Sequence, residues 1–167
     1  EVGAYHHALR LARARFRDQL ERTGGTVSPS LWNVAYPTGL LPTIRLQGAK
    51  GVDPYLIAAI IREESQYDVR AVSRVGAIGL MQVMPFHAGN WGCGSDDLTD
   101  PATNICHGAR IFRDYLARAG GDLDKALLAY NGCVRGLNTP NCHSYPSHVY
   151  SNAGRAALSW WLAEQNE

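Results

Sequence analysis

The stretch that decides the fold covers residues 53–82 and reads DPYLIAAIIREESQYDVRAVSRVGAIGLMQ. It opens with an N-cap aspartate followed by proline, a common start of an α-helix. Ile60 and Ile61 belong to an apolar face at helical spacing. Glu64 follows them by four and three residues and lies near that face, whereas Glu63 is turned about 100° away and can reach solvent. A carboxyl held against apolar walls keeps its proton to higher pH, which suits a general acid.

The same helix end has a plainer interpretation, in which Glu64 joins a charge pair with nearby Arg62 on a solvated face. The segment that follows favours a catalytic role for Glu64 over the charge pair. A glycine-rich turn over residues 76–79 leads into Leu80-Met81-Gln82. It offers close backbone approach, a flexible apolar contact and an amide, which together suit a sugar ring that carries an acetamido group.

Helical periodicity extends along most of the chain, and no β-branched alternation is long enough to build a large sheet. We expect a first helix whose apolar positions are Tyr5, Leu9, Ala12, Phe16 and Leu20. Packing on the domain body is favoured over a basic membrane-surface helix, because Asp18 and Glu21 dilute the basic charge.

Three later helices are indicated by caps and periodicity. Asp100 and a following proline start one that runs to about residue 119, and Asp122 caps a shorter one that ends near Tyr130. The last helix is expected to carry an apolar stripe of Val149, Ala153, Ala157 and Trp161. The sequence therefore predicts a mostly α-helical fold with little or no sheet.

Composition excludes several classes of protein. The chain has 167 residues, the size of one domain, and is 46% hydrophobic and 19% charged, which excludes a disordered tail. No apolar run approaches the roughly 20 residues of a membrane span. A formal net charge of +1 argues against a nucleic-acid binder, and we expect no nucleic-acid partner.

The four cysteines are compatible with two disulfides, for which three connectivities exist. We favour Cys93–Cys106 and Cys133–Cys142, because each pair brackets a polar loop. Disulfides would place the protein outside the cytoplasm, periplasmic or secreted. No charged-then-apolar leader is seen, so we expect any export signal to be missing from this sequence. The alternatives are unpaired thiols, or a zinc site that adds His107 and His143, disfavoured because no Cys-x-x-Cys pair occurs.

Residues 64–82 carry a longer pattern, Glu64-Ser65-x-Tyr67-x3-Ala71-x-Ser73-x2-Gly76-Ala77-x-Gly79-Leu80-Met81-Gln82. It resembles the signature of the soluble lytic transglycosylase catalytic domain, in the goose-type lysozyme superfamily. Later matches follow in the family's order: Asp100-Pro101-x2-Asn104-Ile105-x2-Gly108, Ala129-Tyr130-Asn131 and a late tyrosine, Tyr150. The cysteines are not part of the family pattern.

This resemblance covers about residues 32–160. It implies a single lysozyme-like helical domain with a substrate groove. We expect a helical segment over residues 1–31 packed on the body, followed by a transglycosylase-like catalytic domain over residues 32–167.

The resemblance also implies an activity, cleavage of the β-1,4 bond between N-acetylmuramic acid and N-acetylglucosamine in peptidoglycan. Glu64 would protonate the leaving oxygen and then accept the proton of the muramoyl C6 hydroxyl, which closes a 1,6-anhydro ring. One carboxyl can suffice if the acetamido oxygen shelters the cationic carbon.

Supporting roles follow from the same resemblance. Ser73 and Gln82 would hydrogen-bond the sugar, Met81 would pack on it, and Gly79 would help to hold the ring. Tyr130 and Asn131 would line the cleft, and Tyr150 would orient the Glu64 carboxyl.

Two other functions compete with this one. The first is a lysozyme-type hydrolase that delivers water in place of the C6 hydroxyl, and the second is a catalytically silent peptidoglycan-binding protein. Retention of Glu64 argues against the silent protein, because burying a carboxyl costs free energy that binding alone does not require. We expect a monomer that binds peptidoglycan glycan strands, without cofactor, metal or membrane span.

Overall fold

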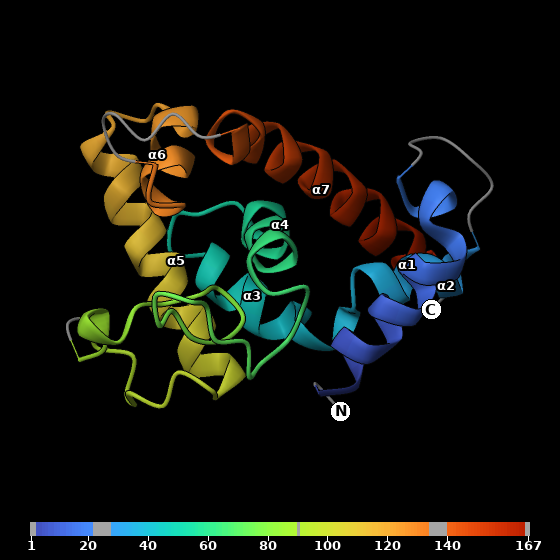
Figure 1. Ribbon diagram of the computed structural model, residues 1–167, viewed down its shortest axis with the longest axis horizontal. Helices are drawn as coiled ribbons and strands as arrows, with labels where there is room; N and C mark the ends of the chain where they lie inside the picture. Colours follow the sequence, from blue (N-terminus) through green and yellow to red (C-terminus); the bar gives the residue numbers. More distant parts are fainter. Residues whose placement is uncertain (1–2, 22–27, 90, 134–139, 166–167) are drawn as a thin grey trace.

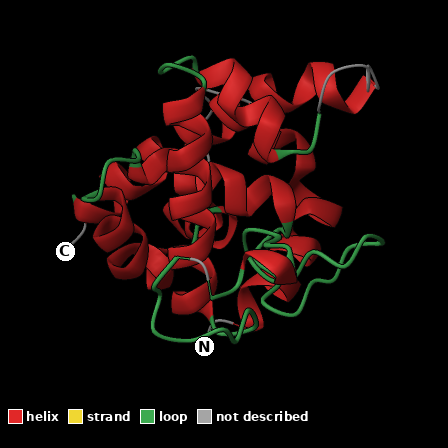
Figure 2. Cartoon of the chain, turned by 90° about the vertical axis from the view of Figure 1, so that its left-hand side faces the viewer, coloured by secondary structure: helices red, strands yellow, loops and turns green. Residues whose placement is uncertain are grey.

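The computed structural model describes residues 3–21, 28–89, 91–133 and 140–165, and no extended strand occurs in these ranges (Figure 2). Isolated bridges join Ile78 to Val72 and to Val83. The predicted mostly α-helical class is confirmed. The helical elements are α1 (Gly3–Glu21), α2 (Pro29–Ala35), η1 (Thr38–Leu40), α3 (Leu41–Gly48), α4 (Pro54–Glu64), η2 (Pro85–His87), α5 (Pro101–Arg118), α6 (Leu123–Tyr130) and α7 (Pro140–Glu164).

Three of the predicted helix starts are confirmed by side-chain caps. In α4, α5 and α6 the aspartate before the helix accepts a hydrogen bond from a backbone N–H of the first turn, which satisfies a donor that would otherwise have no partner. The bonds run from Tyr55 N to Asp53 (2.7 Å), from Thr103 N to Asp100 (2.8 Å) and from Lys125 N to Asp122 (3.0 Å).

Helix α4 lies at the centre of the molecule (Figure 1). It packs against α3 and along α7, while α5 and α6 pair on one side and α1 and α2 on the other. The apolar face of α4 is fully buried, with Ile57, Ile60 and Ile61 all at 0% exposure. Because the central helix ends at Glu64, this packing holds that carboxyl in place.

Helix α1 contributes Leu9 and Leu20 to the hydrophobic core. Phe16, predicted on the same face, is 43% exposed, so that prediction is wrong. The backbone leaves helical geometry at this residue (φ −128°, ψ 25°), which breaks the regular spacing. The domain boundary after residue 31 stays a prediction.

The buried stripe of α7 also differs from the predicted one. It includes Tyr145, Val149, Asn152, Ala156 and Trp160, whereas Trp161 is 55% exposed. The polar Asn152 sits in the middle of this stripe, where it accepts a hydrogen bond from Tyr36 (2.9 Å) and donates one to Glu63 (3.1 Å). A stripe interrupted by asparagine does not stand out as apolar, which explains the wrong register.

Both predicted disulfides are present, Cys93–Cys106 and Cys133–Cys142. The four sulfurs are therefore not available as thiolate ligands, and the alternative zinc site is wrong. His107, proposed for that site, is buried and its Nε2 lies 3.0 Å from the carbonyl oxygen of Ser95.

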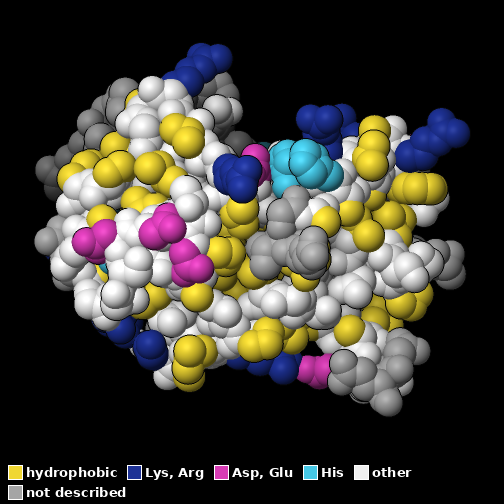
Figure 3. All heavy atoms as spheres, turned by 90° about the horizontal axis from the view of Figure 1, so that it is seen from below, with side chains coloured by type: hydrophobic (Ala, Val, Ile, Leu, Met, Phe, Trp, Pro, Cys, Tyr) yellow, Lys and Arg dark blue, Asp and Glu magenta, His cyan; other side chains and the backbone are white. Residues whose placement is uncertain are grey.

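Figure 3 shows basic side chains interspersed with acidic and hydrophobic ones on one face. Among the helices that the structure describes, none combines the length and the apolar character that a bilayer crossing requires.

Candidate active site

Glu64 is the last residue of α4, and its side chain is partly buried. Its Oε1 accepts a hydrogen bond from the Tyr145 hydroxyl on α7 (2.6 Å). The side chain of Asn131, just after α6, also hydrogen-bonds this carboxyl. The end of α4, the residue after α6 and the first part of α7 therefore meet at one carboxyl group.

The pKa of Glu64 is raised from 4.5 to about 7, mainly by burial and in smaller part by the negative charge of Glu63. The hydrogen bonds from Tyr145 and Asn131 act in the opposite direction, because they stabilise the carboxylate. A carboxyl that titrates near neutral pH can both donate and accept a proton under physiological conditions.

The two tyrosines beside Glu64 remain neutral hydrogen-bond donors. Burial and the nearby Glu64 charge raise the pKa of Tyr145 and of Tyr130 well above the ordinary value. The Tyr130 hydroxyl donates to the carbonyl oxygen of Met81 (2.7 Å), and its ring packs edge-on against Phe112. Tyr130 thereby ties α6 to the turn that follows α4.

Glu63 faces away from Glu64. Its carboxylate lies 3.0 Å from His148 Nδ1 and accepts a hydrogen bond from Asn152, both on α7. Arg62 donates instead to the carbonyl oxygen of Ala35 (3.0 Å). The exposed Glu64–Arg62 charge pair, considered as an alternative, is therefore not formed, and the difference between the two glutamates predicted from the sequence is confirmed.

The glycine-rich turn is held by Asn104 of α5. Its Nδ2 donates to the carbonyl oxygens of Ile78 (2.9 Å) and Leu98 (2.8 Å), and its Oδ1 accepts from Met81 N (2.7 Å). Gly79 lies against this side chain with φ +77°, and a Cβ there would come within 2.4 Å of Asn104 Nδ2. Only glycine fits this position without a shift of its neighbours.

Ser73 and Gln82 both stabilise the chain around this turn. Ser73 Oγ accepts from Ala77 N (2.9 Å), and Gln82 Nε2 donates to the carbonyl oxygen of Gly79 (2.9 Å). Gln82 also adopts a left-handed backbone conformation (φ 47°), which is unusual for a non-glycine residue. Both side chains are partly exposed, and their contact with substrate stays a prediction.

Two of the predicted sugar contacts are wrong in this structure. Met81 has no exposed surface, and Gly79 is buried as well. The Met81 side chain fills the space beside Gly108 of α5, where a Cβ would lie 2.5 Å from its sulfur. Both residues support the turn from its buried side and do not expose a surface to a ligand.

The predicted role of Tyr150 is also wrong. Its hydroxyl donates to Asp124 of α6, and Tyr145 makes the bond to Glu64. Tyr145 and Tyr150 are five residues apart, and at 100° per residue this separation is about 140° more than one full turn. The two side chains therefore point to different sides of α7. The missed signal was helical spacing: Tyr145 lies four residues before Val149, which was predicted to be buried.

The comparison with protein families agrees with this geometry. The family model described as the transglycosylase SLT domain matches residues 41–141. The chain belongs to the transglycosylase SLT family. Glu64, the glycine-rich turn, Tyr130 and Asn131 lie inside the matched region, while α1 and Tyr145 lie outside it.

Named relatives of this SLT-family chain include phage and bacterial proteins. The "Transglycosylase" of Enterobacteria phage PRD1 is 42% identical over 105 residues, which are 60% of this chain and 37% of the phage protein. The "Endo-type membrane-bound lytic murein transglycosylase A" of Klebsiella pneumoniae (strain 342) is 32% identical over 151 residues, 81% of this chain and 68% of that protein. The chain thus spans little more than a third of the phage relative.

A solved structure shows the same fold. The 70-kDa soluble lytic transglycosylase of Escherichia coli aligns with a TM-score of 0.55 at 23% identity, over 91% of this chain and 26% of that one. Its complex with bulgecin A aligns with the same TM-score at 25% identity, over 87% of this chain and 25% of that one.

Proposed function

We propose that this SLT-family chain is a peptidoglycan lytic transglycosylase that cleaves the β-1,4 bond between N-acetylmuramic acid and N-acetylglucosamine. The observation that carries the proposal is the environment of Glu64, a buried carboxyl with a pKa of about 7 at the family's motif position. The named relatives, which are transglycosylases, support the choice of reaction.

In the first step, protonated Glu64 donates its proton to the glycosidic oxygen as the bond to C1 breaks. General acid catalysis of this kind contributes about 10²–10⁴-fold to the rate. The hydrogen bond from Tyr145 to Oε1 fixes the orientation of the carboxyl group and stabilises the carboxylate that this step produces.

In the second step, the Glu64 carboxylate accepts the proton of the muramoyl C6 hydroxyl, whose oxygen bonds to C1. The product is a 1,6-anhydro ring, and Glu64 returns to its protonated form. Glu63 is engaged by His148 and Asn152 on the far side of α4, so one carboxyl performs both transfers. The tethered hydroxyl outcompetes water when the ring is held in the reactive pose.

The remaining residues of the site suit recognition of the sugar. Asn131 is exposed beside Glu64, and Tyr130, Ser73 and Gln82 are partly exposed. The Nε2 of Gln82 is committed to the turn, which leaves Oε1 as the acceptor for an acetamido N–H. The two disulfides support a location outside the cytoplasm, where such bonds persist, and we propose that the chain acts there as a monomer.

The test is digestion of purified peptidoglycan followed by mass spectrometry and borohydride reduction of the fragments. A transglycosylase releases muropeptides one water lighter than a hydrolase does, and their anhydro ends do not take up hydride. Glu64→Gln should abolish release, and Glu63→Gln is the matched control that should retain it. Reducible muramoyl ends would assign the chain as a hydrolase, and an inert wild-type protein would make it a silent binder.

A further inference from the structure

A pocket of about 550 Å³ lies between α1, the C-terminal end of α4 and α7. Its volume falls in the range of small-molecule sites, about 300–1,000 Å³. Glu63 lines this pocket, whereas Glu64 points to Tyr145 on another side of α4. The pocket is therefore separate from the carboxyl that carries the proposed function.

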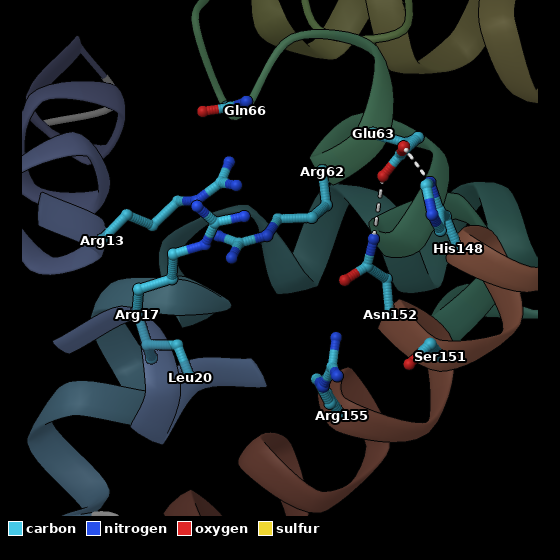
Figure 4. A pocket seen from close by; sticks show the side chains of 10 residues that line it. All are labelled: Arg13, Arg17, Leu20, Arg62, Glu63, Gln66, His148, Ser151, Asn152 and Arg155. Carbon is cyan, nitrogen blue, oxygen red and sulfur yellow. Dashed lines mark hydrogen bonds and ion pairs between the residues drawn. The ribbon is translucent and has the colours of Figure 1, made fainter. Parts of the chain in front are cut away.

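Arginines dominate the pocket wall. Arg13 and Arg17 come from α1, Arg62 from α4 and Arg155 from α7. In Figure 4 the side chains of Arg13 and Arg17 extend from α1 toward the end of Arg62, and Arg155 points into the same space from below. Glu63 is the acidic residue of the lining, and its carboxylate is occupied by His148 (3.0 Å) and Asn152 (3.1 Å).

Arg62 forms the floor and is rigidly held. It is 9% exposed, its Nη1 donates to the carbonyl oxygen of Ala35, and its guanidinium lies 5.2 Å from the centre of the Tyr36 ring. Arg17 and His148 are exposed and form an open rim. A ligand can therefore enter the pocket from solvent between the exposed rim residues and reach the Arg62 guanidinium at its floor.

The convergence of like charges has a cost. Burial lowers the pKa of Arg62, and the positive charges of Arg13 and Arg155 lower it further. Like charges that lie close together repel more strongly at partly buried positions than in bulk water. Such an arrangement is stabilised when an anion sits between the guanidinium groups, which bind carboxylate and phosphate through paired N–H donors.

The pocket is also built largely outside the region that defines the family. Three of its four arginines, Arg13, Arg17 and Arg155, lie outside residues 41–141, whereas Arg62, Glu63 and Gln66 lie inside. The site therefore depends on how α1 and α7 are placed in this particular chain.

We propose that this pocket binds a small ligand bearing two or more oxyanion groups, carboxylate or phosphate, held by Arg13, Arg17, Arg62 and Arg155. The ligand bridges α1 to α4 and α7, and its binding stabilises the docking of α1. The proposal does not depend on the activity of Glu64.

The test is titration calorimetry with two probes, citrate for carboxylates and pyrophosphate for phosphates, at constant ionic strength set with sodium chloride. We expect saturable binding of at least one probe by the wild-type protein. Binding of citrate alone assigns carboxylate as the ligand group, binding of pyrophosphate alone assigns phosphate, and binding of both supports the shared oxyanion chemistry.

Variants locate the site. The double variant Arg13→Gln/Arg17→Gln should weaken binding by at least about 10-fold, since it removes two charged hydrogen-bond donors to the ligand. Arg15→Gln is the matched control, because Arg15 is an exposed arginine of the same helix that does not line the pocket. If the double variant does not fold, Arg17→Gln alone serves, since that side chain is exposed. The proposal is overturned by absence of saturable binding to the wild-type protein, or by equal weakening in Arg15→Gln.

Discussion

Removing the Tyr145 hydroxyl should shift the pH dependence of the reaction upward. In the structure this hydroxyl donates to Glu64 Oε1 over 2.6 Å, and it lowers the pKa of this carboxyl against the larger effect of burial, which leaves the pKa at about 7. A hydrogen bond to a charged group contributes roughly 1.5–3 kcal/mol, and one pKa unit corresponds to about 1.4 kcal/mol. Tyr145→Phe should therefore raise the pKa of Glu64 by about one to two pH units.

The direction of the effect on rate follows from the role of Glu64. As the acid of the first step it must be protonated in the free enzyme, so kcat/KM falls as pH rises through its pKa. For the wild-type protein this alkaline limb should be centred near pH 7. In Tyr145→Phe the limb should move up, while the rate on the acidic plateau falls by up to about 10²-fold because the carboxyl is no longer oriented.

The assay is the release of soluble muropeptides as a function of pH, together with a carbon-13 NMR titration of the Glu64 carboxyl. Tyr150→Phe is the matched control, because that hydroxyl bonds Asp124, and its profile should coincide with the wild type. The reasoning is refuted if the alkaline limb of Tyr145→Phe stays in place or moves down, or if Tyr150→Phe produces the same shift.

Three further predictions concern the stability of the fold and of the site. The pKa of Glu64 in the folded protein (about 7) exceeds its ordinary value of 4.5, so the native state binds more protons than the unfolded state between these pH values. The wild-type protein should therefore lose about 3 kcal/mol of unfolding free energy from pH 4.5 to 7, and Glu64→Gln should not show this loss. Parallel pH profiles of the two proteins in urea unfolding would contradict this prediction. Gly79→Ala should destabilise the protein by roughly 2–4 kcal/mol, because φ is positive at this position and the new Cβ clashes with Asn104. Gly94→Ala, at a position with φ +82° and open space around it, should cost only about 1–2 kcal/mol. Equal losses of stability in urea unfolding would show that the clash at Gly79 is relieved. Replacing either cysteine pair by serine should lower the free energy of unfolding by roughly 3 kcal/mol. Only loss of Cys133–Cys142 should also lower turnover, because this bond links the segments that carry Asn131 and Tyr145. Equal turnover in the two variants would show that this disulfide does not support the active site.

Local rules explain what could be predicted from the sequence. Asp53, Asp100 and Asp122 act within three residues of themselves, so their caps are visible in the sequence. The disulfides close short loops and were predictable for the same reason. The position of Glu64 near the buried face was predictable from its distance to the apolar positions of its own helix, and its catalytic role was predicted from the resemblance of residues 64–82 to the family signature.

The errors concern relations between helices. The choice between Tyr145 and Tyr150 depends on the rotation of α7 against α4, and the buried Asn152 hides that rotation from a reading of apolar residues. The burial of Met81 depends on Gly108, which leaves room for its side chain beside α5. The arginine pocket also depends on the packing between helices, because it forms only when α1 is placed beside α4 and α7.

The central claim is that Glu64 activates the substrate's own C6 hydroxyl and not a water molecule. The most direct measurement is digestion of peptidoglycan by the wild-type protein in water enriched in oxygen-18, with mass spectrometry of the released muropeptides. If the C6 oxygen closes on C1, no label enters the muramoyl product, and Glu64→Gln releases nothing. Incorporation of one oxygen-18 atom at C1 for each bond cleaved would show that water is the acceptor and would contradict the account.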